Sequence, residues 1–141
     1  MPDPHEVQHF TPTRSSNVSK ADRAVPISGP ERDLLCTLSY VHLACGQSAH
    51  SLALLRLVVH EHSQDVELLR ILAYALISER LGEEALSVLD RLDMLDDQPS
   101  SRLPLLLLRS HALRQAGRMA EAQATFKRYV SLRGNPAPVK Q

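Results

Sequence analysis

The chain has 141 residues, of which 43% are hydrophobic, and its 16 basic and 16 acidic side chains give a formal net charge of zero. This length suits one domain with an apolar core, and the absence of net charge removes the long-range field that draws proteins to nucleic acid or anionic lipid. We therefore expect neither a nucleic acid partner nor insertion into a membrane.

Residues 1–27 are rich in Pro, Ser and Thr, include Asn17, and carry few sizeable apolar side chains. Ordering about 27 residues costs on the order of 40 kcal/mol, whereas burying about five such side chains returns at most about 15 kcal/mol. We expect a disordered N-terminal tail, and a second one at residues 135–141. The N-terminus has no basic head followed by an apolar run, so we expect no secretory signal and a cytoplasmic protein.

The first helix is predicted to begin after Ser28, because Ser28 and Glu31 have the spacing of a capping box. Pro30 is tolerated there, since its missing N–H would have no helical partner in the first turn. This helix runs to about residue 46, and its partner covers about 48–62.

Ser63 and Asp65 are candidate N-caps for a third helix over about 66–81. The fourth helix covers about 83–95, and residues 96–101 form a linker.

Ser100 or Ser101 is expected to cap the fifth helix, with Pro104 tolerated in its first turn. The sixth helix covers about 119–133, and the Gly- and Pro-rich residues that follow it forbid a continuation. Arrays of helices usually end in a helix with a polar outer face. Either the sixth helix is polar enough alone, or another chain covers this end.

One pair of small residues recurs in three places. Ala73 and Ala85 are 12 residues apart, and pairs with the same spacing stand 34 residues earlier and 37 residues later, namely Ser39 with Ser51 and Ser110 with Ala122. Small residues at these points let two paired helices approach closely. The pattern predicts three helical hairpins of similar construction.

A glycine stands near the turn of each predicted hairpin, at Gly46, Gly82 and Gly117. We expect each of them to take the left-handed conformation that ends a helix. The large apolar residues repeat as well, except that Arg109 stands where Leu38 and Leu72 stand in the earlier hairpins.

These features resemble tetratricopeptide repeats. The 34-residue period is that of this family, and residues 117–126 keep its G-x4-A-x3-F spacing. The resemblance covers about residues 31–134. It implies an all-α domain at 28–134, with three tandem helix-turn-helix repeats in a short right-handed superhelix, at about residues 32–65, 66–102 and 103–134.

In tetratricopeptide arrays the first helix of every pair lines the concave side. The side chains expected on that side flank the small marker residues, and they are Cys36, Tyr40, Leu43, Arg70, Tyr74, Ile77, Leu107, His111 and Arg114. This set predicts a groove with an apolar and aromatic centre and two arginines to one side, which suits an amphipathic helix or an extended peptide. The alternative is that the two tyrosines only pack between helices.

The sequence shows no chemistry-bearing motif. Cys36 and Cys45 are nine residues apart on one predicted helix, so they point to different faces and we expect two reduced thiols. His60 and His62 are two apart on a helix and cannot share one ion. There is no H-E-x-x-H, C-x-x-C, Gly-rich phosphate loop or G-x-S-x-G. We expect no enzyme, no cofactor and no metal site.

A short chain with three degenerate repeats and the helix turn SERLGEEALSVLDRL, residues 78–92, resembles the small bacterial type III secretion chaperones. It is most similar to the YscG/PscG group, which guards the needle subunit. The resemblance implies a bacterial cytoplasmic chaperone that keeps an aggregation-prone secreted subunit monomeric, in a heterodimer or heterotrimer. The needle protein's amphipathic helix would lie in the groove, with Arg70 and Arg114 available to its acidic residues, and a small helical co-chaperone would cover an outer or terminal surface.

Two alternatives remain open at the level of sequence. One is a generic adaptor or scaffold that tethers two stable proteins. The other is a chaperone of translocator proteins, a related three-repeat class whose clients bind as extended peptides rather than as helices.

Overall fold

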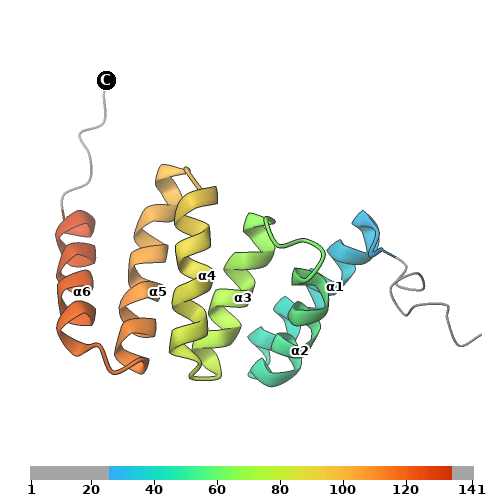
Figure 1. Ribbon diagram of the computed structural model, residues 1–141, viewed down its shortest axis with the longest axis horizontal. Coiled ribbons are helices and arrows are strands. Elements are labelled where there is room, and N and C mark those ends of the chain that lie inside the picture. Colours follow the sequence, from blue (N-terminus) through green and yellow to red (C-terminus); the bar gives the residue numbers. More distant parts are fainter. Residues whose placement is uncertain (1–25, 135–141) are drawn as a thin grey trace, which may run out of the picture.

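The computed structural model describes residues 26–134, which form six α-helices and one short 3-10 helix (Figure 1). The part of the chain that is described contains no strand, so the all-α prediction is confirmed there. The predictions of disordered tails fall on residues 1–25 and 135–141, outside the described residues. The predicted tail includes Ile27, and this is wrong, because Ile27 packs against the core and its N–H donates to the Glu61 carboxylate at 2.6 Å.

The helices follow the predicted order with small shifts at their ends. They are α1 (Gly29–Ala44), α2 (Ser48–Val59), α3 (Val66–Ser78), α4 (Gly82–Leu95), η2 (Pro99–Ser101), α5 (Arg102–Gln115) and α6 (Met119–Gly134). Three antiparallel pairs pack together, and we name α1 with α2 hairpin 1, α3 with α4 hairpin 2, and α5 with α6 hairpin 3. Since α2 also packs on α3 and α4 on α5, the hairpins stand in a row (Figure 1).

Local capping explains where two of the helices begin. The Ser28 hydroxyl accepts from the Glu31 N–H at 3.3 Å, and the Glu31 carboxylate accepts from the Ser28 N–H at 3.4 Å, so the predicted capping box is confirmed. Asp65 caps α3 by accepting from the Leu68 N–H at 3.2 Å. Ser101 is the N-cap residue of α5, as predicted, but its side chain makes no capping hydrogen bond, and its hydroxyl accepts from Arg70.

The small residues that mark the three hairpins are all buried. Their exposed fractions lie between 0 and 7%, for Ser39, Ser51, Ala73, Ala85, Ser110 and Ala122. Around them lies a continuous apolar core that is densest in hairpin 2, where α3 and α4 each bury six residues. Arg109, which breaks the leucine series, reaches from α5 to two carboxylates of α4, Asp90 at 2.8 Å and Asp93 at 2.5 Å. Among the described residues no helix is long and apolar enough to span a bilayer.

The turn glycines behave as predicted in hairpins 1 and 3 but not in hairpin 2. Gly46 and Gly117 have φ angles of 77° and 78°, in the left-handed region. In hairpin 2 that conformation belongs to Arg80, with φ of 62°, which stands 34 residues after Gly46 and 37 before Gly117. Gly82 serves a different purpose: it opens α4 where a Cβ would lie 2.6 Å from the Ala112 carbonyl oxygen of α5.

We expect Gly82→Ala to lower the free energy of unfolding by about 1–3 kcal/mol, because the added methyl group overlaps the backbone of α5 and forces the helices apart. Urea unfolding followed by circular dichroism measures the change. Gly29→Ala is the matched control, since a Cβ at that position meets nothing within 4 Å. Equal stability of Gly82→Ala and the wild type would contradict the close approach of α4 and α5.

Replacing Arg80 with glycine should raise the free energy of unfolding rather than lower it. A non-glycine residue in the left-handed region carries a steric cost of roughly 1–2 kcal/mol, part of which the greater chain entropy of glycine offsets. We expect Arg80→Gly to raise stability by up to about 1 kcal/mol, seen as a higher melting temperature. A lower melting temperature would mean that the Arg80 side chain makes stabilising contacts that outweigh the backbone cost.

Candidate functional site

The side chains predicted to line a groove all lie on α1, α3 and α5, the first helices of the three hairpins. The structure does not gather all of them in one trough. It divides them among an apolar cavity, a charged cavity, and a cavity of about 230 Å³ in which Arg70 and Tyr74 meet.

The apolar cavity lies between hairpins 2 and 3 and has a volume of about 440 Å³. Four of the predicted residues meet in it, namely Tyr74, Ile77, Leu107 and His111, and four others complete its wall, namely Leu103, Pro104, Leu108 and Tyr129. Tyr74 is 48% exposed, so its ring is not sealed between helices. The wall presents two phenol rings and aliphatic side chains to the solvent, which is the composition of a site for an apolar ligand group.

The charged cavity lies between α1 and α3 and has a volume of about 500 Å³. Tyr40 is on its wall and is 63% exposed, and Cys36 forms part of the same wall. Cys36 is buried in the core, and burial raises the pKa of its thiol, so it stays protonated at neutral pH. The rest of the wall is largely polar, made by Arg32, Asp33, Thr37, Glu67 and Ile71.

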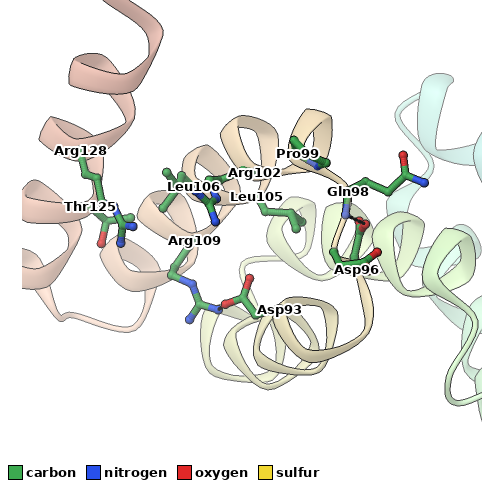
Figure 2. Close-up of a pocket in the computed structure, with 11 residues that line it drawn as sticks. Asp93, Asp96, Gln98, Pro99, Arg102, Leu105, Leu106, Arg109, Thr125 and Arg128 are labelled. Atoms are coloured by element: carbon green, nitrogen blue, oxygen red, sulfur yellow. Dashed lines mark hydrogen bonds and ion pairs between the residues drawn. The ribbon is translucent and has the colours of Figure 1, made fainter. Parts of the chain in front are cut away.

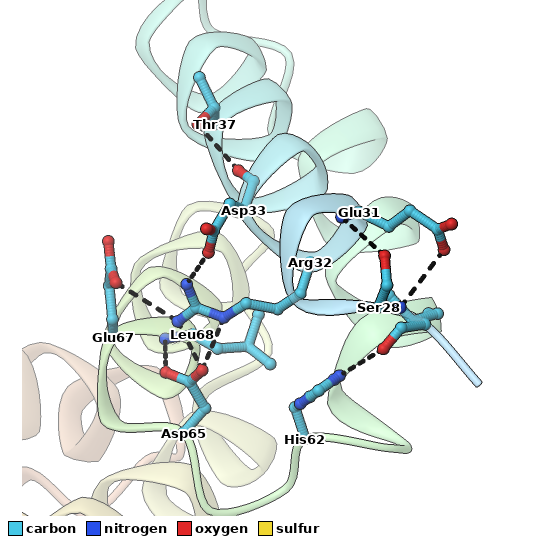
Figure 3. Close-up of polar contacts among 10 residues, drawn as sticks. Ser28, Glu31, Arg32, Asp33, Thr37, His62, Asp65, Glu67 and Leu68 are labelled. Atoms are coloured by element: carbon cyan, nitrogen blue, oxygen red, sulfur yellow. Dashed lines mark hydrogen bonds and ion pairs between the residues drawn. The ribbon is translucent and has the colours of Figure 1, made fainter.

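Arg32 is the centre of the polar contacts beside this cavity (Figure 3). Its guanidinium donates to Asp65 at 2.7 Å, to Asp33 at 2.7 Å and to Glu67 at 3.3 Å. The hydrogen bond to Asp33 is the largest of the influences that raise the pKa of Arg32. Because Asp65 also caps α3, this cluster joins the first turn of α1 to the first turn of α3.

Arg70 is already paired within the chain. Its guanidinium donates to the Asp96 carboxylate, with Nε 3.1 Å from Oδ2, and to the Ser101 hydroxyl at 2.6 Å. The Asp96 side chain is only 1% exposed, and the hydrogen bond from Arg70 holds its pKa below the ordinary value for an aspartate. The sequence had suggested that Arg70 is free for acidic groups of a partner, whereas it ties α3 to the connection between α4 and α5.

The two remaining predicted residues differ in exposure. Leu43 is half-buried and packs against the core. Arg114 is exposed in the last turn of α5, one turn beyond His111 of the apolar cavity. Arg114 is therefore close to the apolar cavity along α5 but is not part of its wall.

Tyr129 is the functional candidate that sequence reasoning missed. It stands 37 residues after Leu92, which in turn stands 34 after Val58, and both of those residues are completely buried. The repeat pattern therefore marks Tyr129 as a core residue. It reaches the apolar cavity because α6 belongs to the last hairpin, and within residues 26–134 no helix follows to cover it.

A further cavity, of about 630 Å³, lies between the end of α4, the linker and helices α5 and α6 (Figure 2). Three arginines and three aspartates line it, namely Arg102, Arg109, Arg128, Asp93, Asp96 and Asp97. Figure 2 shows Arg109 turned toward Asp93, and Asp96 is held by Arg70 from outside this cavity. Its charges balance, so the cavity has no excess positive charge to attract an anion.

Within residues 26–134 no three His, Cys, Asp or Glu side chains form a group that could hold a metal ion. No protein-family model matches the chain, and comparison with curated proteins gives no match. A function can therefore be inferred only from the residues and the geometry of the site.

The ion pair of Arg70 and Asp96 predicts a pH-dependent stability. Because the folded-state pKa of Asp96 lies below the unfolded value of about 3.9, the pair contributes stability above that value and loses it as the pH falls through the folded pKa. We expect Asp96→Asn to unfold at lower urea concentration than the wild type at pH 7, and the difference to shrink as the pH falls below the unfolded pKa and through the folded one.

Asp97→Asn is the control, since Asp97 is exposed beside the same linker. A difference between Asp96→Asn and the wild type that is the same at pH 7 and at acid pH would show that the charge of Asp96 is not what stabilises the linker.

Proposed function

We propose that this protein is a tetratricopeptide-like chaperone of a bacterial type III secretion system, which binds an aggregation-prone secreted subunit and keeps it monomeric before export. In this proposal the three hairpins form a short right-handed superhelix with α1, α3 and α5 on its concave side. The 34-residue period and the burial of the small residue pair in each hairpin support the repeat assignment.

The observation that carries the proposal is the apolar cavity with Tyr74 and Tyr129 in its wall. Its aliphatic and aromatic surface is open to solvent, and exposed apolar surface of this kind marks a place where another molecule binds. The apolar face of an amphipathic helix can cover Tyr74, Ile77 and Leu107 together, because these residues come from two neighbouring helices that present one surface.

The needle protein is the client that we favour. A subunit that polymerises through an amphipathic helix has to keep that helix covered until it leaves the cell, and the apolar face of such a helix matches the composition of this surface. Arg114, exposed close to the cavity along α5, is available to acidic side chains on the polar face of the client. We further propose that the complex forms in the cytoplasm and includes a small helical co-chaperone, as a heterotrimer.

One observation favours a second candidate, a chaperone of translocator proteins. The face formed by α1, α3 and α5 carries three cavities: the apolar one, the charged one, and one of about 230 Å³ that Arg70 and Tyr74 line. Separate cavities suit the alternating side chains of an extended peptide. A generic adaptor would bind a stable partner through the same face without changing that partner's tendency to aggregate.

The proposal predicts that co-expression with a needle-type subunit and its small helical co-chaperone yields a soluble 1:1:1 complex in which the subunit is monomeric. Tyr74→Asp should weaken client binding by at least about tenfold, because client binding would bury the new carboxylate in an apolar wall. Isothermal titration measures the affinity, and circular dichroism confirms that the variant stays helical.

Met94→Asp is the control, since Met94 is 87% exposed on α4 and lines none of the cavities described here. A subunit that polymerises unhindered in the presence of this protein would overturn the chaperone proposal. Retained affinity in Tyr74→Asp would overturn the assignment of the apolar cavity as the client site. NMR of the isotope-labelled bound client distinguishes a helix from an extended peptide.

A further inference from the structure

Helix α1 carries an apolar stripe that nothing covers within the described residues. The stripe consists of Leu34, Leu38 and Val41, whose exposed fractions are 59%, 40% and 49%. The equivalent residues of hairpin 2 lie 34 positions later in the sequence. They are at most 5% exposed, namely Leu68, Leu72 and Ala75. Hairpin 1 therefore exposes the surface that hairpin 2 buries.

Two contacts of hairpin 3 show what such a surface packs against. Arg109, which holds the position of Leu38, bonds Asp93 of α4 at 2.5 Å. Ala112, which holds the position of Val41, has its carbonyl against Gly82 at the start of α4. This side of the first helix in a hairpin therefore faces the second helix of the preceding hairpin, and α1 has no preceding hairpin among residues 26–134.

The other end of the row has the matching surface. On α6 three large apolar side chains are open to solvent, namely Met119, Phe126 and Val130, each between 48% and 51% exposed. They hold the positions of the α4 residues that face α5, namely Gly82, Leu89 and Asp93. Leu89 lies between Gly82 and Asp93 on the same side of α4 and is 1% exposed, whereas Phe126 is 48% exposed.

We propose that a second copy of this chain docks head-to-tail, with the α1 stripe of one copy on the α6 face of the other. The two open ends are the two halves of a junction that the chain already forms twice, between α2 and α3 and between α4 and α5. Leu38 holds the position of Arg109, and Val130 holds the position of Asp93. If α1 of one copy packs on α6 of the other as α5 packs on α4, Leu38 therefore meets Val130, and an apolar contact replaces the ion pair between Arg109 and Asp93.

The new junction is looser than the internal ones. Met119 stands where Gly82 lets α4 approach α5, so the helices lie further apart at that point and the flexible methionine fills the gap. Gln123 stands where Leu86 is buried in hairpin 2. Both changes reduce the apolar contact, so association needs a higher protein concentration than a tight dimer does.

A contact of this kind joins two different surfaces, so each dimer keeps one free α1 stripe and one free α6 face and can bind further copies. The apolar cavity with Tyr74 borders the α6 end only at Tyr129, whose ring stacks on that of Phe126 with 6.1 Å between the ring centroids. The rest of its wall comes from α3 and α5, so docking on the α6 face leaves Tyr74 uncovered. Self-association is measured without a client, so failure of this inference is distinguishable from failure of the proposed function.

Sedimentation velocity of the full chain over a range of concentrations tests the proposal. We expect the wild type to sediment faster as its concentration rises. Leu38→Asp and Phe126→Asp should each weaken self-association at least about tenfold, because each places a charge in the apolar contact. An equimolar mixture of the two variants should form a 1:1 complex, since one keeps an intact α6 face and the other an intact α1 stripe.

Met94→Asp, on an exposed site at neither end, should associate like the wild type. If Leu38→Asp or Phe126→Asp loses its helical circular dichroism, the mixing experiment is repeated with Val41→Asp and Val130→Asp. A wild type that stays monomeric at all concentrations, or a mixture that forms no heterodimer, would overturn the proposal. Loss of association in Leu38→Asp with no effect of Phe126→Asp would indicate a two-fold dimer through α1 and would overturn it as well.

Discussion

The close approach of paired helices at six small residues is the contact on which the rest of the structure depends. A larger side chain at Ala73 or Ala85 would hold α3 and α4 apart and expose the leucines that pack around them. The same holds between hairpins at Gly82, where the α5 backbone leaves no room for a Cβ. These contacts set the spacing of the helices, and the spacing determines the cavities between them.

Three arginines hold the hairpins in register across their outer edges. Arg32 links α1 to the start of α3, Arg70 links α3 to the connection before α5, and Arg109 links α5 to α4. Each guanidinium is satisfied by carboxylates of a neighbouring segment, so these arginines are structural rather than available to a ligand. What remains open on the α1, α3 and α5 face is chiefly aromatic and aliphatic around Tyr74, which is why we assign binding to that region.

Much of the fold could be predicted from the sequence, because the small residue pairs and the capping residues Ser28 and Asp65 act locally. The left-handed conformation predicted for Gly82 was wrong, because the glycine is required by the close approach of α5, a segment distant in the sequence. The side chains that meet in the apolar cavity were partly predictable, because Tyr74 and His111 flank marker residues. The pairing of Arg70 and the contribution of Tyr129 depend on tertiary contacts that no single helix encodes.

Burial is distributed unevenly along the row of hairpins. Helices α3 and α4 each bury six residues, whereas α6 buries only Ala122, so α6 is held by far less apolar contact than the centre. In a row of stacked units, opening starts at the terminal unit and exchanges fastest there. A ligand that rests on both Tyr74 and Tyr129 joins α3 to α6 and adds contact where the row of hairpins has the least burial, so the bound complex melts at a higher temperature than the free chain.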